Sequence, residues 1–273
     1  MELIKAILLG ILQGLTEFLP VSSSGHLVIG AKLLGFDEPG IAFEVFLHLG
    51  TLLAVVIVFR RELMRMVSAP FLILTGDKKN VDQETELFFR WDLYIIVATI
   101  PAVIVGLFLK DRIEAIFSNI LVTFTMLAVT SVIMVLTRYL RNRHKEINCP
   151  RAFAIGVAQS LAILPGLSRS GSTIFTGMLL GIDRETVARF SFIMSIPAIL
   201  GAVVLQLGDL LATPPGKDEM LNLFAGTVAS SISGYGAIIL LLAIVRRGRL
   251  HWFGYYCFLL SALGFCWYLR TNL

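Results

Sequence analysis

Two short polar segments, LPVSSSGH (residues 19–26) and LPGLSRSGST (residues 164–173), interrupt stretches of sequence that are otherwise apolar. The apolar stretches are residues 1–36 and 152–182, and each polar segment lies near the middle of its stretch. Neither half of a stretch reaches the roughly 20 residues that a helix needs to cross a bilayer. Each stretch is therefore predicted to form a re-entrant helical hairpin, which enters and leaves the membrane on the same side. Irregular backbone at that depth has to be buried in protein or line a wet cavity.

The composition of the whole chain is that of a membrane protein. Of its 273 residues, 56% are hydrophobic and only 15% are charged, whereas a soluble domain carries about 25% charged residues. A soluble globular protein is excluded, membrane lipids are expected partners, and no nucleic-acid partner is expected. Six further apolar segments have the length of a membrane-crossing helix: 41–59, 91–109, 119–137, 186–208, 221–245 and 252–269.

The two hairpin regions are copies of one another. At an offset of 146 residues, ten of the 28 positions from 10 to 37 are identical in the second region, where chance gives roughly two or three in so biased a composition. The chain is therefore interpreted as a tandem duplication within one membrane domain, 1–273. Repeat one covers 1–145 and repeat two covers 146–273.

Each repeat contains one hairpin, which does not cross, and three predicted spans, which is an odd number. The fold class predicted is thus an all-α polytopic membrane protein with an inverted-topology repeat, six transmembrane helices and two hairpins that meet near the midplane. Loops on one side hold 16 Lys and Arg, against six on the side of residues 1–40. The basic side is cytoplasmic by the positive-inside rule, so both termini and the active site are predicted to face outward from a bacterial plasma (inner) membrane. The charged segment 60–90 is predicted to be a solvated cytoplasmic connection.

The repeats differ where the chemistry is expected. The differing pairs are Glu17 and Ile163, Ser23 and Arg169, and His26 and Ser172. One copy supplies an acid and an imidazole, and the other supplies a cation. The difference predicts a single site that is shared between the two hairpins.

Gln13 and Glu17 are four residues apart, so on a helix they project from one face. An ionised glutamate at lipid depth is costly without a partner or a function. Mg²⁺ takes one or two carboxylates and fills its other positions with water and phosphate oxygens. The pair is predicted to bind a divalent metal, Mg²⁺ with Ca²⁺ as the alternative. The competing interpretation is two polar residues on a packed helix.

Ser22, Ser23, Ser24 and His26 follow the break at Pro20. Serines after a proline often cap helices, so Ser22 and Ser24 are predicted to act either as caps or as substrate-binding hydroxyls. If the segment is helical, His26 shares a face with Ser23 and is placed to deprotonate its hydroxyl. A structural histidine is the alternative.

Arg169 lies among Ser168, Ser170 and Thr173. A guanidinium fork fits phosphate oxygens in bidentate fashion, and hydroxyls and free amides at a helix N-terminus add further donors. This segment is therefore predicted to bind an anion. The alternative is a buried ion pair between Arg169 and Glu17 that joins the repeats, and the two roles are compatible in the resting protein.

GLTEFLPVSSSGH (14–26) and PGLSRSGST (165–173) resemble the two signature regions of the undecaprenyl-diphosphate phosphatase family, the bacitracin-resistance type. The resemblance covers nearly the whole chain, including FEVFLHLGTLLAV (43–55) and FSFIMSIPAILGA (190–202). It implies that a divalent metal assists hydrolysis of undecaprenyl diphosphate to the monophosphate. That product is the lipid carrier recycled for peptidoglycan synthesis.

The resemblance also implies roles for individual residues. It places the active-site serine and histidine on Ser23 and His26, and the metal on Gln13 and Glu17, with Glu17 as the carboxylate ligand. The second motif falls on Pro165, Gly166, Ser168, Arg169, Ser170 and Thr173. His48 stands where the family is expected to have an amide.

Glu44 and His48 are four residues apart inside the first predicted span. Polar groups at that depth are functional candidates. They are predicted either to form a supporting polar pair or to line the cavity.

Phosphoryl transfer depends on charge stabilisation and alignment more than on covalent chemistry. The predicted mechanism has Arg169 hold the diphosphate while Ser23, activated by His26, attacks the terminal phosphorus, and water then hydrolyses the phosphoserine. Attack by water or by His26 itself stays open at this point, as does a homodimer. The alternative function is a transporter or flippase of an anionic polyprenyl lipid or phosphate, because inverted repeats also build secondary transporters.

Overall fold

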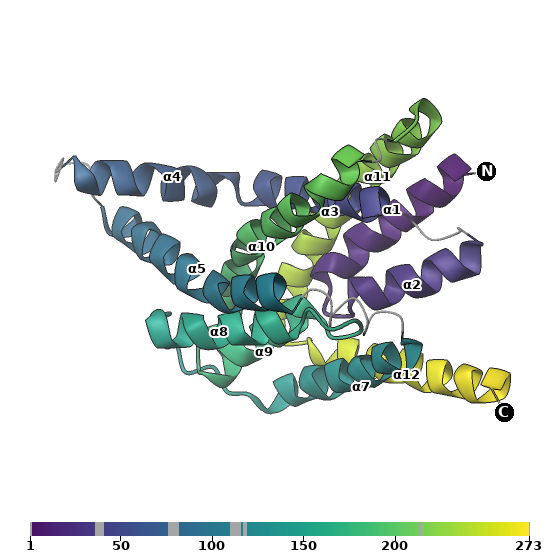
Figure 1. Cartoon of the computed structure of the whole chain (residues 1–273). Coiled ribbons are helices and arrows are strands. Elements are labelled where there is room, and N and C mark those ends of the chain that lie inside the picture. Colours follow the sequence, from purple (N-terminus) through teal and green to yellow (C-terminus); the bar gives the residue numbers. More distant parts are fainter. Residues whose placement is uncertain are drawn as a thin grey trace.

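The computed structural model of the chain describes residues 2–35, 41–75, 82–109, 116, 119–212 and 215–272. These residues form helices and no sheet. In chain order the named helices are α1 (Glu2–Phe18), α2 (Ser23–Leu34), α3 (Ile41–Val58), α4 (Arg60–Leu74), α5 (Gln83–Phe108), α7 (Ile120–Leu136), the short 3₁₀ helix η1 (Thr137–Tyr139), α8 (Cys149–Leu161), α9 (Arg169–Leu179), α10 (Arg184–Ala212), α11 (Lys217–Arg246) and α12 (His251–Asn272). Figure 1 shows their arrangement.

Five of these helices, α5, α7, α10, α11 and α12, are long and apolar enough to cross a membrane. Helices α3 and α4 provide a sixth candidate if they are counted as one span, bent by 78° at Phe59. The predictions of an all-helical, multi-pass chain are confirmed, with five to six candidate spans among the described residues.

The segment 60–90, predicted as a solvated connection, is helical for most of its described length. Helix α4 occupies Arg60–Leu74 and α5 begins at Gln83. Helix α4 packs against α5, and its residues Met66 and Ala69 are buried. The charged residues interspersed along α4 obscured this buried apolar face in the sequence.

The two stretches predicted as hairpins each form a pair of short helices that pack against each other, α1 with α2 and α8 with α9. The first break covers residues 19–22 and the second covers 162–168. Both pairs end on a glycine in the left-handed backbone region, Gly35 with φ 56° and Gly181 with φ 86°. These two glycines correspond at the offset of 146 residues.

Each hairpin is anchored to a long helix from the other half of the chain. Helix α1 packs on α11, and α8 packs on α5. A Cβ atom added at Gly10 would lie 2.4 Å from the carbonyl oxygen of Gly226, and one added at Gly156 would lie 2.1 Å from that of Ala98. Small residues of this kind let two membrane helices approach backbone to backbone. Gly10 and Gly156 also correspond at the same offset.

Aromatic residues pack around the first break and hold it against α10. Phe18, the last residue of α1, meets Phe192 of α10 edge to face, with 5.6 Å between ring centroids. Phe59 also contacts Phe192, with 6.0 Å between ring centroids, and all three side chains are fully buried. The position of the first break is thereby fixed by core packing.

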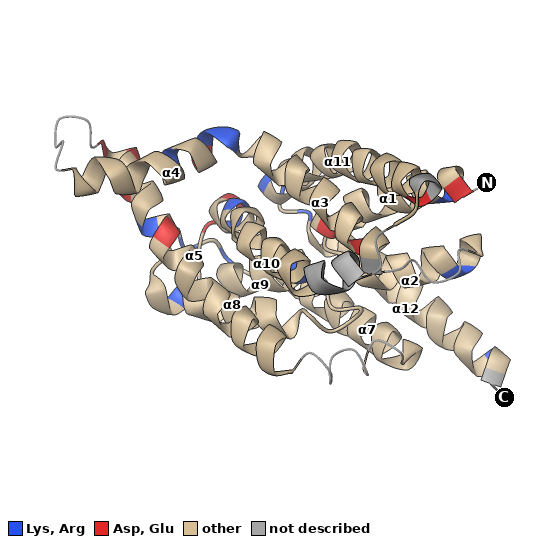
Figure 2. Cartoon of the chain, turned by 45° about the horizontal axis from the view of Figure 1, so that its top comes forward, with Lys and Arg blue, Asp and Glu red and all other residues tan. Residues whose placement is uncertain are grey.

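The charged residues are distributed unevenly along the molecule. Both termini lie at one end (Figure 1), and Lys and Arg gather mainly at the other end, around α4 and the beginning of α5 (Figure 2). The two helix breaks lie between these ends.

Candidate active site

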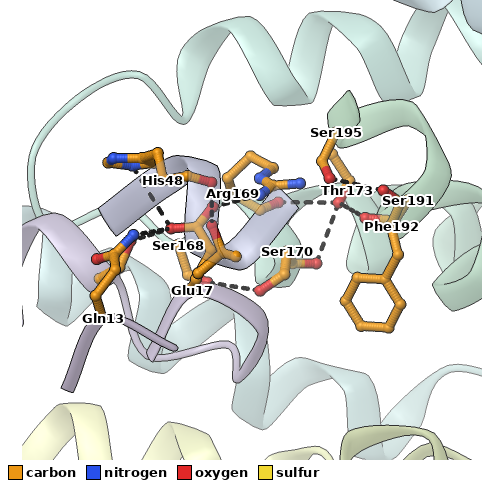
Figure 3. Close-up of polar contacts among 12 residues, drawn as sticks. Gln13, Glu17, His48, Ser168, Arg169, Ser170, Thr173, Ser191, Phe192 and Ser195 are labelled. Atoms are coloured by element: carbon orange, nitrogen blue, oxygen red, sulfur yellow. Dashed lines mark hydrogen bonds and ion pairs between the residues drawn. The ribbon is translucent and has the colours of Figure 1, made fainter. Parts of the chain in front are cut away.

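The two helix breaks are joined by an ion pair between Glu17 and Arg169. Arg169 Nη2 donates to Glu17 Oε1 at 2.5 Å, although the residues are 152 positions apart in the chain (Figure 3). Their side chains are only 7% and 16% exposed. Glu17 lies at the end of α1 and Arg169 at the start of α9, so each break brings its charged residue to the same point. The ion pair weighed in the sequence analysis is present.

The second oxygen of the Glu17 carboxylate collects the remaining polar groups of the site. Glu17 Oε2 accepts from Ser23 Oγ at 2.7 Å and from Gln13 Nε2 at 3.0 Å. His48 Nε2 lies 3.9 Å from the same oxygen. Figure 3 shows Gln13, His48 and Arg169 converging on Glu17 from three helices. The carboxylate is therefore the centre of the site.

Two polar atoms beside this carboxylate are buried and have no partner among the described residues: Arg169 Nη1 and Gln13 Oε1. An unsatisfied buried polar group costs roughly 1–3 kcal/mol, and more when it is charged. Native proteins rarely carry such groups without a functional reason. One of the two is a cationic donor and the other a neutral acceptor, so together they fit an anion and a cation bound side by side.

Gln13 and Glu17 fit a divalent cation with few protein ligands. The free Oε1 belongs to the amide whose nitrogen already touches Glu17. The described residues contain no cluster of three or more His, Cys, Asp or Glu side chains that could hold a metal. Water and phosphate oxygens would have to complete the coordination, which is the usual situation for Mg²⁺.

The structure pairs Ser23 and His26 differently from the prediction. The Ser23 hydroxyl donates to Glu17, while His26 Nδ1 lies 2.7 Å from the carbonyl oxygen of Ser22 and His26 Nε2 lies 2.7 Å from the Tyr256 hydroxyl. A carbonyl only accepts, so Nδ1 carries the proton and Nε2 of the neutral ring accepts from Tyr256. The two rings are stacked, 14° from parallel. Glu17, rather than His26, is in place to receive the Ser23 proton.

The backbone of Ser22 explains this pairing. Ser22 has φ 69° and ψ 99°, in the left-handed region, and caps α2 by accepting from the backbone N–H of Gly25 at 3.4 Å. For a residue other than glycine such a conformation costs of order 1–3 kcal/mol and is found mainly at functional sites. Ser22 Oγ also lies 3.3 Å from Ser24 Oγ. These two predicted substrate-binding hydroxyls thus bond to the hairpin itself in this structure.

Ser168 and Ser170 form the corresponding cap in the second hairpin. Ser168 Oγ accepts from the backbone N–H of Gly171 at 3.1 Å and lies 3.3 Å from Ser170 Oγ. The backbone N–H of Ser168 is bound by the Thr130 hydroxyl at 3.0 Å. Both hydroxyls hold the turn from which Arg169 projects.

Thr173 and Gly166 also support this turn. The Thr173 hydroxyl donates to the carbonyl oxygen of Arg169 at 2.9 Å and lies 2.5 Å from Ser191 Oγ, and in Figure 3 it points toward Ser191 and away from Glu17. Gly166 has φ 93°, and a Cβ added there would lie 2.1 Å from the Thr123 carbonyl oxygen. In this structure Thr173 and Gly166 contribute packing and backbone geometry around Arg169.

Two neighbours of the site come from distant helices. His48, predicted only as a polar pair with Glu44 or as cavity lining, donates through Nδ1 to the Glu44 carbonyl oxygen at 2.8 Å and turns its other nitrogen toward Glu17. Tyr256 of α12 was not predicted at all, because an aromatic residue in an apolar span carries no functional signal in a single sequence. Its contact with His26 becomes visible only when the helices are packed.

Comparison with known proteins identifies the family. The sequence profile described as Bacitracin resistance protein BacA matches residues 6–263. The chain belongs to the BacA family. The match covers both helix breaks and all the site residues described above.

Curated relatives of the BacA family are similar to the chain over almost its full length. A protein of Desulforapulum autotrophicum named undecaprenyl-diphosphatase is 42% identical over 270 residues, covering 96% of this chain and 97% of the relative. Proteins of Rubrobacter xylanophilus and Desulfosudis oleivorans with the same name are 43% and 44% identical, with the same coverage. A protein of Methanobrevibacter smithii, also named undecaprenyl-diphosphatase, is 42% identical, and the match covers 97% of each chain.

Proposed function

We propose that this chain hydrolyses undecaprenyl diphosphate to undecaprenyl phosphate and inorganic phosphate. In this way it recycles the lipid carrier for cell-wall synthesis and confers resistance to bacitracin. One observation carries the proposal: the buried Arg169 guanidinium has one nitrogen on Glu17 and one nitrogen free, beside a serine hydroxyl bonded to the same carboxylate. Family membership supports the same activity.

Substrate binding is proposed to exchange the partner of Arg169. In the resting site Glu17 is the anion that compensates the guanidinium. A diphosphate carries more charge and offers oxygens in the geometry that a guanidinium fork prefers. When Arg169 turns both nitrogens to the phosphate, Glu17 Oε1 loses its ion-pair partner and is freed for the divalent cation, while Oε2 keeps its contact with Ser23. Binding of the substrate thus activates the site.

The chemical step follows from the contact between Ser23 and Glu17. Ser23 Oγ forms a bond to the terminal phosphorus while its proton passes to Glu17 Oε2, 2.7 Å away. The bond from that phosphorus to the bridging oxygen breaks, and undecaprenyl phosphate leaves with the electron pair. Water then hydrolyses the phosphoserine, releasing inorganic phosphate and restoring the hydroxyl. Ser22 and Tyr256 fix His26 in one tautomer. Its Nε2 is proposed as a second proton-accepting atom in the first hairpin, besides the Glu17 carboxylate.

Gln13 and Glu17 are the residues proposed to hold Mg²⁺, with Ca²⁺ as the alternative. A bound divalent ion would supply neutralisation of the charge that develops on the phosphate oxygens. The free Oε1 of Gln13 supports this assignment.

We propose that the chain has six spans and two re-entrant hairpins related by an inverted repeat. Three observations support this arrangement: the matching contacts of α1 with α11 and of α8 with α5, the corresponding glycines of both hairpins, and the collection of Lys and Arg at the end away from the termini. By the positive-inside rule the site opens outward from the plasma membrane. A homodimer stays a prediction, testable by the mass of the purified protein in detergent.

The proposed activity is tested by phosphate release from a long-chain polyprenyl diphosphate, using the purified full-length protein with Mg²⁺ and with a chelator. Release by the wild type and its loss in Ser23→Ala are expected. Folded wild-type protein that binds the lipid without releasing phosphate would favour the carrier instead. For the orientation, a cysteine placed at position 23 should react with an impermeant reagent added outside, and reaction from the inside alone would reverse the topology.

A further inference from the structure

A pocket of about 530 Å³ lies at the bend between α3 and α4, where these helices meet α10 and α11. Four arginines, one glutamate and five apolar residues line it. Glu17 and Arg169 are not among the lining residues, so this pocket is separate from the proposed active site. Its mixture of cationic and apolar groups has no role in the proposed reaction.

Two of the four arginines are already compensated. Arg189 donates to Glu62 at 2.9 Å and to Glu185 at 3.1 Å. Arg246 donates to Glu185 through two nitrogens, at 2.9 and 2.7 Å. This network ties α4, α10 and α11 together around the pocket.

The other two arginines, Arg60 and Arg61, have no acidic partner among the residues that the structure describes. Arg60 Nη1 donates only to the backbone carbonyl of Ile57, at 3.0 Å, and Arg61 makes no hydrogen bond or ion pair within the described part of the chain. Both are exposed. They occupy the first turn of α4, where the helix dipole disfavours cations, so helix stability does not explain them. Two guanidinium groups at the mouth of the pocket are thus available to an external anion.

The apolar side of the pocket continues along α11. Ile239 lines the pocket and is 48% exposed, and Val228, Ile232 and Tyr235 are exposed above it. Their spacing of four, three and four residues places them on one helix face. Helix α11 is one of the candidate spans, so this face meets acyl chains in the bilayer.

We propose that this pocket binds an anionic phospholipid of the phosphatidylglycerol class. The headgroup phosphate lies between Arg60 and Arg61, and one acyl chain follows the exposed face of α11 past Ile239. Basic pockets between membrane helices on the cytoplasmic side recognise anionic headgroups in this way. The bound lipid bridges α4 and α11 and stabilises the bend between α3 and α4. The proposal does not depend on the phosphatase activity.

The test uses the purified full-length protein, stripped of lipid in detergent and titrated with phosphatidylglycerol, phosphatidylcholine or inorganic phosphate. Bound lipid is counted by native mass spectrometry, and the thermal unfolding midpoint is recorded. Phosphatidylglycerol is expected to bind at least about tenfold more tightly than phosphatidylcholine, to remain bound as a defined one-lipid complex and to raise the midpoint. Equal binding of the two lipids would overturn the proposal. A rise of the same size with inorganic phosphate would indicate a plain anion site and would overturn the lipid assignment.

The double variant Arg60→Ala with Arg61→Ala is expected to lose the preference for phosphatidylglycerol. The matched control is Arg138→Ala with Arg141→Ala, which removes two other exposed arginines that do not line the pocket and should retain the preference. If both double variants lost the preference for phosphatidylglycerol equally, general surface charge would explain the preference, and the proposal would be contradicted. A second variant, Ile239→Trp, changes no charge and fills the apolar side, so it should weaken binding of the lipid. If Ile239→Trp bound the lipid as tightly as the wild type, the proposed path of the acyl chain past Ile239 would be wrong.

Discussion

The two hairpins, α1–α2 and α8–α9, share their framework and differ in their chemistry. The second helix of each is capped by a serine, Ser22 or Ser168, which accepts from the N–H of a glycine three residues later, Gly25 or Gly171. Each capping serine lies 3.3 Å from the serine two residues further on. Positions that are identical in the two copies therefore make the same capping contacts twice.

The differing positions carry the groups proposed to react. The first hairpin contributes Glu17, Ser23 and His26, whereas the second contributes Arg169. The backbone differs as well. Ser22 has φ 69° while Ser168 has an ordinary φ of −70°, and the carbonyl of Ser22 faces the imidazole of His26. The two hairpins thus share their capping contacts and differ in the side chains proposed to act in the reaction.

The largest expected effect comes from the cation that only the second hairpin has. Arg169→Ala should reduce kcat/KM for phosphate release by at least about 100-fold, because about 2.7 kcal/mol of transition-state stabilisation corresponds to that factor. The variant leaves Glu17 without its ion-pair partner. Arg141→Ala, which removes an exposed arginine elsewhere, should leave the rate unchanged. Retention of more than a tenth of the activity by Arg169→Ala would show that the guanidinium does not bind the reacting phosphate.

Substitution of the corresponding glycines, Gly10 and Gly156, should destabilise the packing of both hairpins on their partner helices. Gly10→Ala and Gly156→Ala each place a Cβ within 2.4 Å of a backbone oxygen on a partner helix, and overpacking of this kind costs typically 1–3 kcal/mol. Both variants should lower the thermal unfolding midpoint in detergent. Gly236→Ala is the control, because nothing lies within 4 Å of its added Cβ and alanine is favoured in a helix interior. A large loss at one glycine and none at the other would show that the two hairpins are anchored differently.

The hairpins and the long helices could be predicted because their signals are local in sequence. Breaks in the apolar runs placed the turns near Pro20 and Pro165, and the duplication singled out Glu17 and Arg169 as unlike positions. Helix α4 was missed because its charged residues hide its buried face. The local pattern therefore fails where polar and apolar residues are mixed along one helix.

The pairing of Ser23 and His26 could not be predicted correctly. Helical spacing favoured a hydrogen bond between them, but the partner of His26 depends on the φ angle of Ser22 and on Tyr256, which is 230 residues away. Neither is visible in a single sequence. The residue types at the site could thus be predicted, while the hydrogen bonds among them follow from the packing of distant helices.

The contact of Tyr256 with His26 is a further difference between the two hairpins. The second hairpin has Ser172 in the place of His26, and the Ser172 hydroxyl has no partner among the described residues. Tyr256→Phe keeps the stacked ring and removes the hydroxyl bonded to His26 Nε2. Losing one hydrogen bond of about 1 kcal/mol should lower kcat about fivefold, change KM little and alter the pH profile of kcat. Tyr255→Phe, on the same helix, is the matched control and should have no effect. An unchanged pH profile in Tyr256→Phe would assign the tyrosine to packing alone.

The smallest expected effect is the difference in stability between two variants of the capping serines, Ser22→Gly and Ser168→Gly. Glycine replaces serine at a helix cap at a cost of only a few tenths of a kcal/mol, and it adopts positive φ without strain. Ser22→Gly therefore loses a weak cap but relieves the strain at φ 69°, whereas Ser168→Gly, at φ −70°, loses the cap and gains backbone freedom in the unfolded state. Ser22→Gly should be the more stable variant by about 1 kcal/mol, measured by thermal unfolding in detergent. Equal stabilities would mean that the first hairpin stores no strain at its cap, and the difference between the two copies would then lie in side chains alone.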